Sequence, residues 1–301
     1  MKSLLFTGAS GFLGINTLPI ISKSYTVDTL GMSKSDTYRV DLSKQIPKLN
    51  KAYNIVLHAA GKAHLVPKTR KEIESFYDVN LQGTINLCDA LERTGLPQSL
   101  IFVSSVAVYG CEEGVLITEN YPLKGTSPYA ESKKEAEAYL QQWCCGKDVV
   151  LTILRPSLLA GINPPGNLGA MINGINKGKY LSIGGGRSRK SIAMACDIGR
   201  LIPFCERRGG VYNFCDSYNP SFRQLERLIA MQLKRRPPHI IPYWIAFVLS
   251  SIGDLIGKDA PINSAKLRKI TSTLTFSNKK IIEELGFCPL NVLENFHIRN
   301  Y

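Results

Sequence analysis

The stretch from Ser3 to Gly14, SLLFTGASGFLG, constrains the fold more than any other part of this sequence. A short apolar run of β-forming residues leads into three glycines, Gly8, Gly11 and Gly14, and an apolar segment then begins. The first glycine lets the chain turn sharply off a strand, the second lets backbone approach a ligand closely, and the third lets a helix pack close to the strand. The pattern therefore predicts a strand, a tight turn and a helix start.

A turn of this kind is typical of a binding site for a pyrophosphate. The first turn of the helix offers unpaired N–H groups and the positive end of its dipole to an anion. Three glycines alone are a weak signal, and an ordinary glycine-rich turn is the alternative. The strand before them and the helix after them favour dinucleotide binding.

The first half of the chain alternates short apolar strands with helices. The expected strands are 25–30, 54–60, 100–104 and 149–154, and a helix is expected over 76–93. Continuous apolar strands separated by helices predict a parallel sheet covered on both faces. The expected fold is α/β, a Rossmann-type doubly wound sheet.

Glycine- and proline-rich loops become frequent after Pro156. We expect the dinucleotide-binding domain to span 1–160 and a smaller C-terminal α/β substrate-binding domain to span 161–301. A strand at 210–215 is expected to return to the first sheet. Ser221 and Gln224 form the pattern of a capping box, which predicts a helix from there to about residue 232.

The composition is that of a globular protein, and the sequence argues against a signal peptide, a membrane span and a zinc site. The 301 residues are 44% hydrophobic and 20% charged, ordinary values for a globular protein with a sizeable core. A strand follows Met1 almost at once, so we expect no signal peptide, and no stretch suits a membrane span. The eight cysteines show no zinc-type spacing, which predicts reduced thiols, no metal and a cytoplasmic location.

The positive charge lies almost entirely in the second half. Residues 1–150 hold 16 Lys and Arg against 15 Asp and Glu, whereas residues 151–301 hold 21 against 9. This asymmetry indicates an acidic partner, such as a phosphorylated substrate, nucleic acid or an anionic membrane surface. A solvated basic face without a partner is the alternative. Nucleic acid is not expected, because neither a recognition motif nor interleaved aromatic residues accompany the charges.

A second group of candidate functional residues consists of Ser105 and the pair in the pattern Tyr129-x-x-x-Lys133. Ser127 and Pro128 have the pattern of a helix N-cap and first helical residue, so Tyr129 and Lys133 lie one turn apart on one face. An ammonium held beside a tyrosine lowers the pKa of the phenol and makes it a usable proton donor or acceptor. By itself this spacing occurs often by chance; its position after a strand ending in Ser104 and Ser105 makes it informative.

Further motifs follow in a familiar order. HAAG stands at 58–61, VN at 79–80, VSSVAVYG at 103–110, SPYAESK at 127–133 and LRPS at 154–157. With the glycine turn, they make the chain resemble, nearly from end to end, an extended short-chain dehydrogenase/reductase of the nucleotide-sugar epimerase/dehydratase family.

The resemblance implies specific roles. Tyr129 would be the catalytic acid/base, Lys133 would bind the nicotinamide ribose, and Ser105 would orient the sugar hydroxyl or keto oxygen. The implied cofactor-binding positions are Gly8, Gly11, Phe12, Leu13, Gly14, Asp41, Leu42, Ala59, Ala60, Gly61, Asn80, Tyr129 and Lys133. The implied substrate-binding positions are Ser105, Asn163, Arg189 and Lys190, the two basic residues being placed for a substrate diphosphate.

Two departures from the family pattern bear on the choice of cofactor and on the type of reaction. The acidic residue that usually ends the second strand in NAD-preferring members is Gly31 here, with Ser33 and Lys34 nearby, so NAD or NADP can serve. Ser105-Val106-Ala107 stands where the family's 4,6-dehydratases resemble T-D-E. The carboxylates that would eliminate water are therefore missing at these positions, and dehydration is not expected.

The resemblance then leaves two reactions. The first is epimerisation at a sugar carbon, C4 of a UDP-hexose or UDP-N-acetylhexosamine, in surface polysaccharide biosynthesis. The alternative is NADPH-dependent reduction of a nucleotide-linked or lipid-linked 4-keto deoxysugar. A non-catalytic cofactor-binding sensor is disfavoured, because a sensor has no use for the set Ser105, Tyr129 and Lys133. The family also implies a homodimer. His58 and His64 are expected to be loop residues near the cofactor rather than a base or metal ligands.

The apolar stretch 240–256, IIPYWIAFVLSSIGDLI, has two interpretations. It follows Lys234, Arg235 and Arg236 and is too short to span a bilayer. A buried helix of the substrate domain is favoured. The alternative is a helix lying on the membrane surface, which would place the protein at the inner face of the membrane, with a polyprenyl-diphosphate sugar as a candidate substrate.

Overall fold

The computed structural model describes residues 1–63, 66–256 and 262–298. Its centre is a parallel seven-stranded sheet with the strand order β11-β7-β5-β4-β1-β2-β3. The strands are β1 (Lys2–Thr7), β2 (Tyr25–Gly31), β3 (Tyr38–Arg39), β4 (Ile55–His58), β5 (Ser99–Val103), β7 (Val150–Pro156) and β11 (Gly210–Phe214). The strands expected from the sequence are confirmed, and so is the return of β11 to this sheet.

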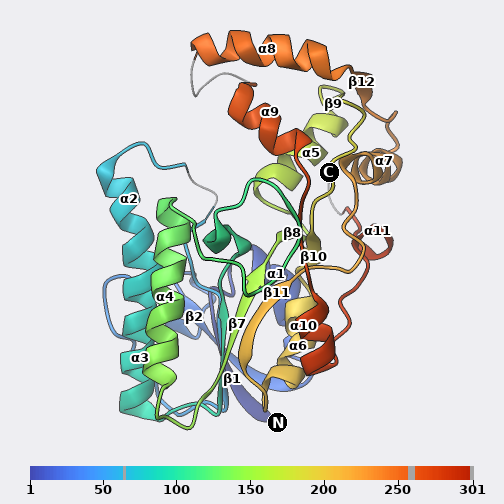
Figure 1. Cartoon of the computed structure of the whole chain (residues 1–301). Helices are drawn as coiled ribbons and strands as arrows, with labels where there is room; N and C mark the ends of the chain where they lie inside the picture. The colour runs from blue at the N-terminus through green and yellow to red at the C-terminus, as the bar shows by residue number, and fades with distance from the viewer. Residues whose placement is uncertain (64–65, 257–261, 299–301) are drawn as a thin grey trace.

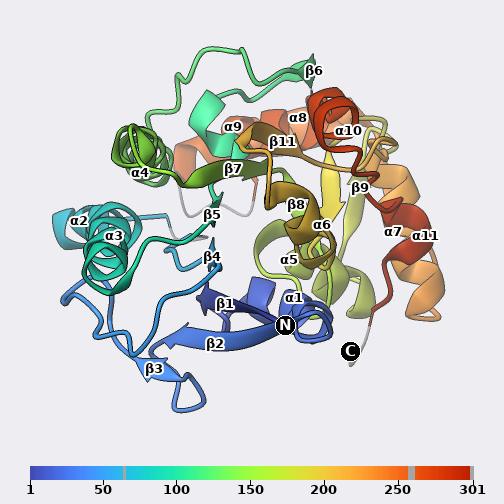
Figure 2. The ribbon, with the colours of Figure 1, turned by 90° about the horizontal axis from the view of Figure 1, so that it is seen from below.

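Helices cover both faces of the sheet (Figure 2). On one face lie α2 (Arg70–Tyr77), α3 (Gly83–Thr94) and α4 (Pro128–Cys144); on the other lie α1 (Phe12–Ile21), α6 (Asp197–Cys205) and α10 (Lys279–Leu285). Each face has its own apolar core, with Leu87 and Leu140 in one and Ile198 and Ile281 in the other. The fold is therefore a doubly wound Rossmann-type α/β fold, as expected.

The helix expected over 76–93 starts earlier than the apolar pattern indicated. It begins at Arg70, because the Thr69 side chain accepts a hydrogen bond from the Glu72 amide and the Glu72 side chain accepts one from the Thr69 amide. Between α2 and α3 the chain winds as a short π-helix, η1 (Asp78–Gln82). Such widened turns are frequent at functional sites.

The second half of the chain builds smaller layers above the carboxyl ends of the sheet (Figure 1). Three two-stranded parallel pairs form there: β8 (Leu158–Ala160) with β10 (Ile192–Met194), β9 (Leu181–Ile183) with β12 (His239–Ile241), and β6 (Gly114–Ile117) with β13 (Leu274–Phe276). The helices α5 (Gly166–Asn176), α7 (Phe222–Gln232) and α11 (Val292–Asn295) share a third apolar core. The capping box of Ser221 and Gln224 opens α7 as predicted. The division at residue 160 stays a prediction.

The helices α8 (Tyr243–Ile256) and α9 (Ser264–Thr271) lie at the end of the molecule farthest from the N-terminus (Figure 1). The favoured interpretation of 240–256 as a buried helix is wrong, because large apolar side chains of α8 are exposed, among them Trp244 and Phe247. Within the described ranges, no helix is both long and apolar enough to cross a membrane.

Candidate active site

The glycine turn has the geometry that its spacing predicted. Gly8 has φ of +79°, and a Cβ there would stand 2.7 Å from the Ala60 nitrogen. A Cβ on Gly14 would stand 1.7 Å from the Ala9 carbonyl oxygen. Side chains are therefore excluded at both positions, at the first by strain and crowding and at the second by close packing of the helix start.

The start of α1 is open to an anion. Gly11 is the N-cap residue, and no side chain accepts a hydrogen bond from the first amides of the helix. Phe12 and Leu13 are the first two residues of α1. Unsatisfied N–H groups at the start of a ten-residue helix, beside a turn that has glycine at positions 8 and 11, fit the pyrophosphate of a dinucleotide. The predicted cofactor therefore has a matching cradle in this chain.

The segment after β4 closes against the same turn. Thr7 binds it, because its carbonyl oxygen accepts from the Ala59 amide at 3.2 Å and its Oγ1 accepts from the Ala60 amide at 3.1 Å. The next residue, Gly61, lies beside two other predicted cofactor positions, since a Cβ there would stand 3.1 Å from both Asn80 Oδ1 and Lys133 Nζ. The structure thus brings together residues from three separate motifs.

Asn80 fixes this junction from η1. Its Oδ1 accepts the Lys62 amide at 2.7 Å, and its Nδ2 donates to Ser132 Oγ on α4 at 2.9 Å. Both polar ends of the buried side chain are therefore used to hold the loop after β4 against α4, next to Lys133.

Lys133 is buried beneath the site. Its Nζ donates to the Val103 carbonyl at 2.9 Å and lies 4.6 Å from the centre of the Phe102 ring. Burial lowers the pKa of Lys133 to about 8, and the nearby Glu137 carboxylate partly offsets this. The ammonium is thus held at the end of β5, and its burial makes its proton easier to lose than that of an exposed lysine.

Tyr129 and Ser105 meet where β5 ends. Ser127 caps α4 and Pro128 is its first residue, as predicted, so Tyr129 lies one turn before Lys133. Burial raises the pKa of Tyr129, and the neighbouring Ser105 hydroxyl lowers it in part. The lowered pKa expected from Lys133 is therefore wrong for this structure, because burial outweighs the other effects.

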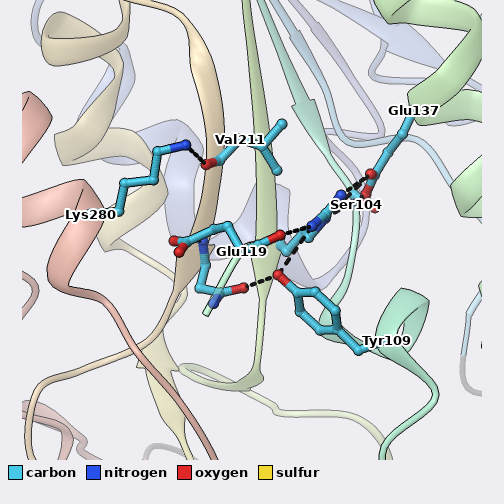
Figure 3. Close-up of polar contacts among 8 residues, drawn as sticks. Ser104, Tyr109, Glu119, Glu137, Val211 and Lys280 are labelled. Atoms are coloured by element: carbon cyan, nitrogen blue, oxygen red, sulfur yellow. Dashed lines mark hydrogen bonds and ion pairs between the residues drawn. The ribbon is translucent and has the colours of Figure 1, made fainter. Parts of the chain in front are cut away.

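A buried ion pair that the sequence analysis missed links β7 to α4; Figure 3 shows its carboxylate, Glu137, close to Ser104. Arg155 Nη2 on β7 donates to Glu137 Oε2 on α4 at 2.6 Å, and Nε of the same guanidinium donates to Oε1 at 3.1 Å. Ser104 also donates to Glu137, and Arg155 Nη1 donates to the Tyr109 hydroxyl at 3.1 Å. The signal was present: Glu137 follows Lys133 by one helical turn, on the same face.

Two of the cofactor positions that the family implies lie at the edge of the sheet. Asp41 accepts from the Ser43 amide and hydroxyl, and these hydrogen bonds lower the pKa of Asp41. Leu42 is buried, and its carbonyl accepts from Asn86 Nδ2 at 2.6 Å. Their assignment to the adenine end of the cofactor stays a prediction.

The end of β2 holds an acidic group that the sequence analysis did not find. A Cβ on Gly31 would stand 2.6 Å from Oδ2 of Asp36, so this carboxylate fills the space of the missing side chain. The Ser33 amide donates to the same oxygen at 2.9 Å and fixes it there. The chain therefore presents a carboxylate at the end of β2 although Gly31 has none.

The predicted substrate residues are placed differently from one another. Arg189 is exposed, and its guanidinium donates to the Asn219 carbonyl at 3.0 Å. Lys190 is half-buried; burial lowers its pKa, and Glu112 acts in the opposite sense. Asn163 is exposed, with φ of +54°, in the loop between β8 and α5. Among the three, Lys190 alone combines partial burial with proximity to the segment that follows Ser105.

His58 is the last residue of β4, so the expectation that it is a loop residue is wrong. It is buried between the hydroxyls of Thr7 and Thr84, at 2.7 and 2.9 Å, and burial lowers its pKa to about 3. A neutral imidazole held from both sides ties β1 and β4 to α3, which agrees with a position beneath the cofactor. His64 lies outside the described residues.

The fold and the site together define a dinucleotide-binding enzyme of the Rossmann type. Residues 4–213 match the model of the NAD dependent epimerase/dehydratase family. The chain belongs to that family, and its cofactor is NAD or NADP.

Two similar proteins are named for the two kinds of reaction that the sequence analysis left open, a 4-epimerase and a reductase. The chain is 28% identical over 298 residues to N-acetyl-alpha-D-glucosaminyl-diphospho-ditrans,octacis-undecaprenol 4-epimerase of Escherichia coli O157:H7, covering 93% of this chain and 88% of the relative. It is 28% identical over 250 residues to GDP-6-deoxy-D-mannose reductase of Pseudomonas aeruginosa, covering 76% and 79%.

A solved structure shows the same fold. UDP-glucose-4-epimerase from Stenotrophomonas maltophila, with bound NAD and formylated UDP-arabinopyranose, superimposes with a TM-score of 0.75 and 18% identity. The superposition covers 98% of this chain and 96% of the other.

Proposed function

We propose that this protein is an NAD-dependent 4-epimerase of a diphosphate-linked sugar, acting in surface polysaccharide biosynthesis. One observation carries the proposal: Tyr129, Ser105 and Lys133 converge at the carboxyl end of β5, beside the loop that closes on the glycine turn. This arrangement joins a proton-transfer site to a pyrophosphate cradle. The similarity to 4-epimerases over nearly the whole chain supports the choice of reaction.

The chain's own residues provide proton transfer and orientation. In the oxidative half, Tyr129 in its deprotonated form takes the proton of the sugar C4 hydroxyl; in the reductive half, when the keto sugar presents its opposite face, Tyr129 returns that proton to the keto oxygen. Ser105 holds that oxygen by a hydrogen bond. Lys133 binds the cofactor ribose and supplies positive charge at the end of β5. A bound nicotinamide supplies the acceptor and donor for the hydride.

NAD is the proposed cofactor, rather than NADP. Asp36 places a carboxylate at the end of β2, where it can accept hydrogen bonds from ribose hydroxyls and repel a 2′-phosphate. The glycine at position 31 left this choice open in the sequence.

A second candidate is a 4-keto reductase. Burial raises the pKa of Tyr129 and so favours the phenol over the phenolate, and a phenol suits donation to a keto oxygen. The similarity to GDP-6-deoxy-D-mannose reductase favours the same reaction. In that case the cofactor would be consumed in each turnover.

The proposed partners follow from the same assignment. The substrate carries a diphosphate, whose far side is a nucleotide or a polyprenol, as in the names of the similar epimerases. Lys190 contacts that diphosphate. The protein forms a homodimer, and residues 240–256 contact a membrane surface at its inner face.

The test combines cofactor analysis with a tyrosine variant. The nucleotide released on denaturing the purified protein is identified, and interconversion of UDP-N-acetylhexosamines and of polyprenyl-diphosphate N-acetylhexosamines at C4 is followed by NMR. Carried-through NAD and conversion in both directions are expected. Tyr129→Phe should lower kcat by about 10²- to 10⁴-fold with nearly unchanged NADH binding. An empty protein that consumes NADPH would establish the reductase, and full activity of Tyr129→Phe would refute both reactions.

A further inference from the structure

Helix α8 carries its large apolar side chains on the outside. Trp244 is 67% exposed and Leu255 88%. The remaining large exposed side chains of the helix are Tyr243, Phe247, Val248, Leu249 and Ile252. A buried amphipathic helix of a globular protein has the opposite arrangement, with its large apolar residues turned towards the core.

The side of α8 that packs on the protein consists of small residues. Ala246, Ser250 and Gly253 are buried, and their spacing of four and three residues puts them on one helical face, next to α9. This close contact holds the helix in place. It also fixes the outward direction of the large side chains, so their exposure follows from how α8 is packed.

Basic side chains flank the exposed apolar face. Lys234, Arg235 and Arg236 are exposed just before β12, which leads into α8. Arg268 and Lys269 are exposed on α9, which lies directly below α8 in Figure 1. The apolar surface thus has one basic group shortly before the start of α8 and another on the helix below it, in the half of the chain that carries nearly all the excess of basic residues.

The basic side chains indicate which kind of partner covers this apolar surface. A second copy placed symmetrically on α8 would bring the basic groups of both chains towards one another, which is repulsive. An anionic lipid surface satisfies both features, because the apolar side chains enter the acyl boundary while the basic groups meet the headgroups.

We propose that α8, with its basic flanks, docks this protein on an anionic lipid bilayer. The helix lies in the plane of the interface. Its 14 residues extend about 21 Å, less than the hydrocarbon thickness of a bilayer. Trp244 and Leu255, the most exposed apolar side chains of the helix, are the main inserted ones, since Trp and Leu are favoured at this depth.

Docking also orients the candidate active site, a step that rests on the proposed function. A cavity of about 510 Å³ lies between α8, α9 and the segment after Ser105, with Phe247, Arg268 and Glu112 in its lining. Lys190 forms a β-bridge with Leu274 of β13, which pairs with Gly114, two residues after Glu112. The docked face therefore brings the proposed diphosphate site close to the bilayer, where a lipid-linked sugar is held.

Vesicle binding tests the docking without any need for activity. The full-length protein is sedimented with phosphatidylcholine vesicles, with and without phosphatidylglycerol. Binding is expected only with the anionic lipid and should weaken with salt. Trp143 is almost fully buried, so a blue shift of tryptophan emission on adding vesicles reports Trp244, the second of the two tryptophans.

Matched variants separate the two contributions. Trp244→Ser with Leu255→Ser should weaken vesicle binding by about tenfold or more, whereas Leu96→Ser, at an exposed apolar position of the other half, should not. Arg235→Glu with Arg236→Glu should abolish the preference for anionic lipid, whereas Lys23→Glu with Arg93→Glu should leave it intact. Thermal unfolding confirms that each variant is folded.

Three results would overturn the proposal. They are no vesicle binding by the wild type, equal binding by the folded Trp244→Ser/Leu255→Ser variant, and a solution dimer that this variant dissociates. The last would assign α8 to a second copy of the chain. None of them affects the epimerase assay with a water-soluble substrate, so docking and the proposed reaction fail independently.

Discussion

Oδ2 of Asp36 lies 2.6 Å from the position that a Cβ of Gly31 would take. The carboxylate therefore occupies the space of the side chain that Gly31 lacks, and the Ser33 amide holds it there. An acidic residue five positions further along the chain thus stands at the end of β2. This relationship bears directly on which cofactor the protein prefers.

Asp36→Asn should reduce the preference for NADH over NADPH by about tenfold, which corresponds to ~1.4 kcal/mol. The amide keeps the volume and an acceptor for Ser33 but no longer repels a 2′-phosphate. Dissociation constants for both nucleotides, from nicotinamide fluorescence, check this. Asp89→Asn on α3 serves as the control for a surface charge change. An unchanged ratio in Asp36→Asn would remove this residue from cofactor selection.

The sequence predicted the sheet and the glycine turn because both depend on local patterns. Gly8 and Gly14 are required by contacts within or next to the first βα unit, and the buried strands are continuous apolar runs. Asp36 was missed because its position depends on a loop that folds back onto β2. Residue spacing along the chain does not reveal such a return.

The orientation of α8 also could not be predicted from the sequence. Its composition is apolar on most of its circumference, so both a buried and a surface helix fit. The outcome depends on which face meets α9, and the small residues Ala246, Ser250 and Gly253 decide it by packing closely.

Arg155 belonged to a motif that the sequence analysis quoted, but its buried partner Glu137 lies on a different element, and the pairing is tertiary.

Glu137→Ala should lower the free energy of unfolding by about 3–5 kcal/mol, because it leaves the Arg155 guanidinium buried without its counter-charge. Urea unfolding at neutral pH measures this. The double variant Glu137→Leu/Arg155→Met should recover most of the loss, since it removes both charges. If Glu137→Ala and the double variant are equally destabilised, the ion pair is not the cause of the loss.

The pH dependence of stability should reveal the buried ammonium of Lys133. Its pKa is about 8 in the folded protein and 10.5 without perturbation. The unfolded chain therefore binds more protons than the folded one between these values, and the wild-type free energy of unfolding gains a rising contribution across that interval. Lys133→Met removes this contribution, which is at most about 1.4 kcal/mol per pH unit. Parallel stability curves for both proteins from pH 7.5 to about 10.5 would contradict the prediction.

Lys190→Ala should raise KM for the sugar substrate by about tenfold with a smaller effect on kcat. The half-buried ammonium lies near Glu112, on the segment that follows Ser105, so it can contact a diphosphate equally well before and during the reaction. Such uniform binding appears in KM. Arg189→Ala is the matched control, because the exposed Arg189 guanidinium already binds the Asn219 carbonyl and is expected to alter KM little. Steady-state kinetics of both variants distinguish the two neighbours, and an unchanged KM in Lys190→Ala would place the diphosphate elsewhere.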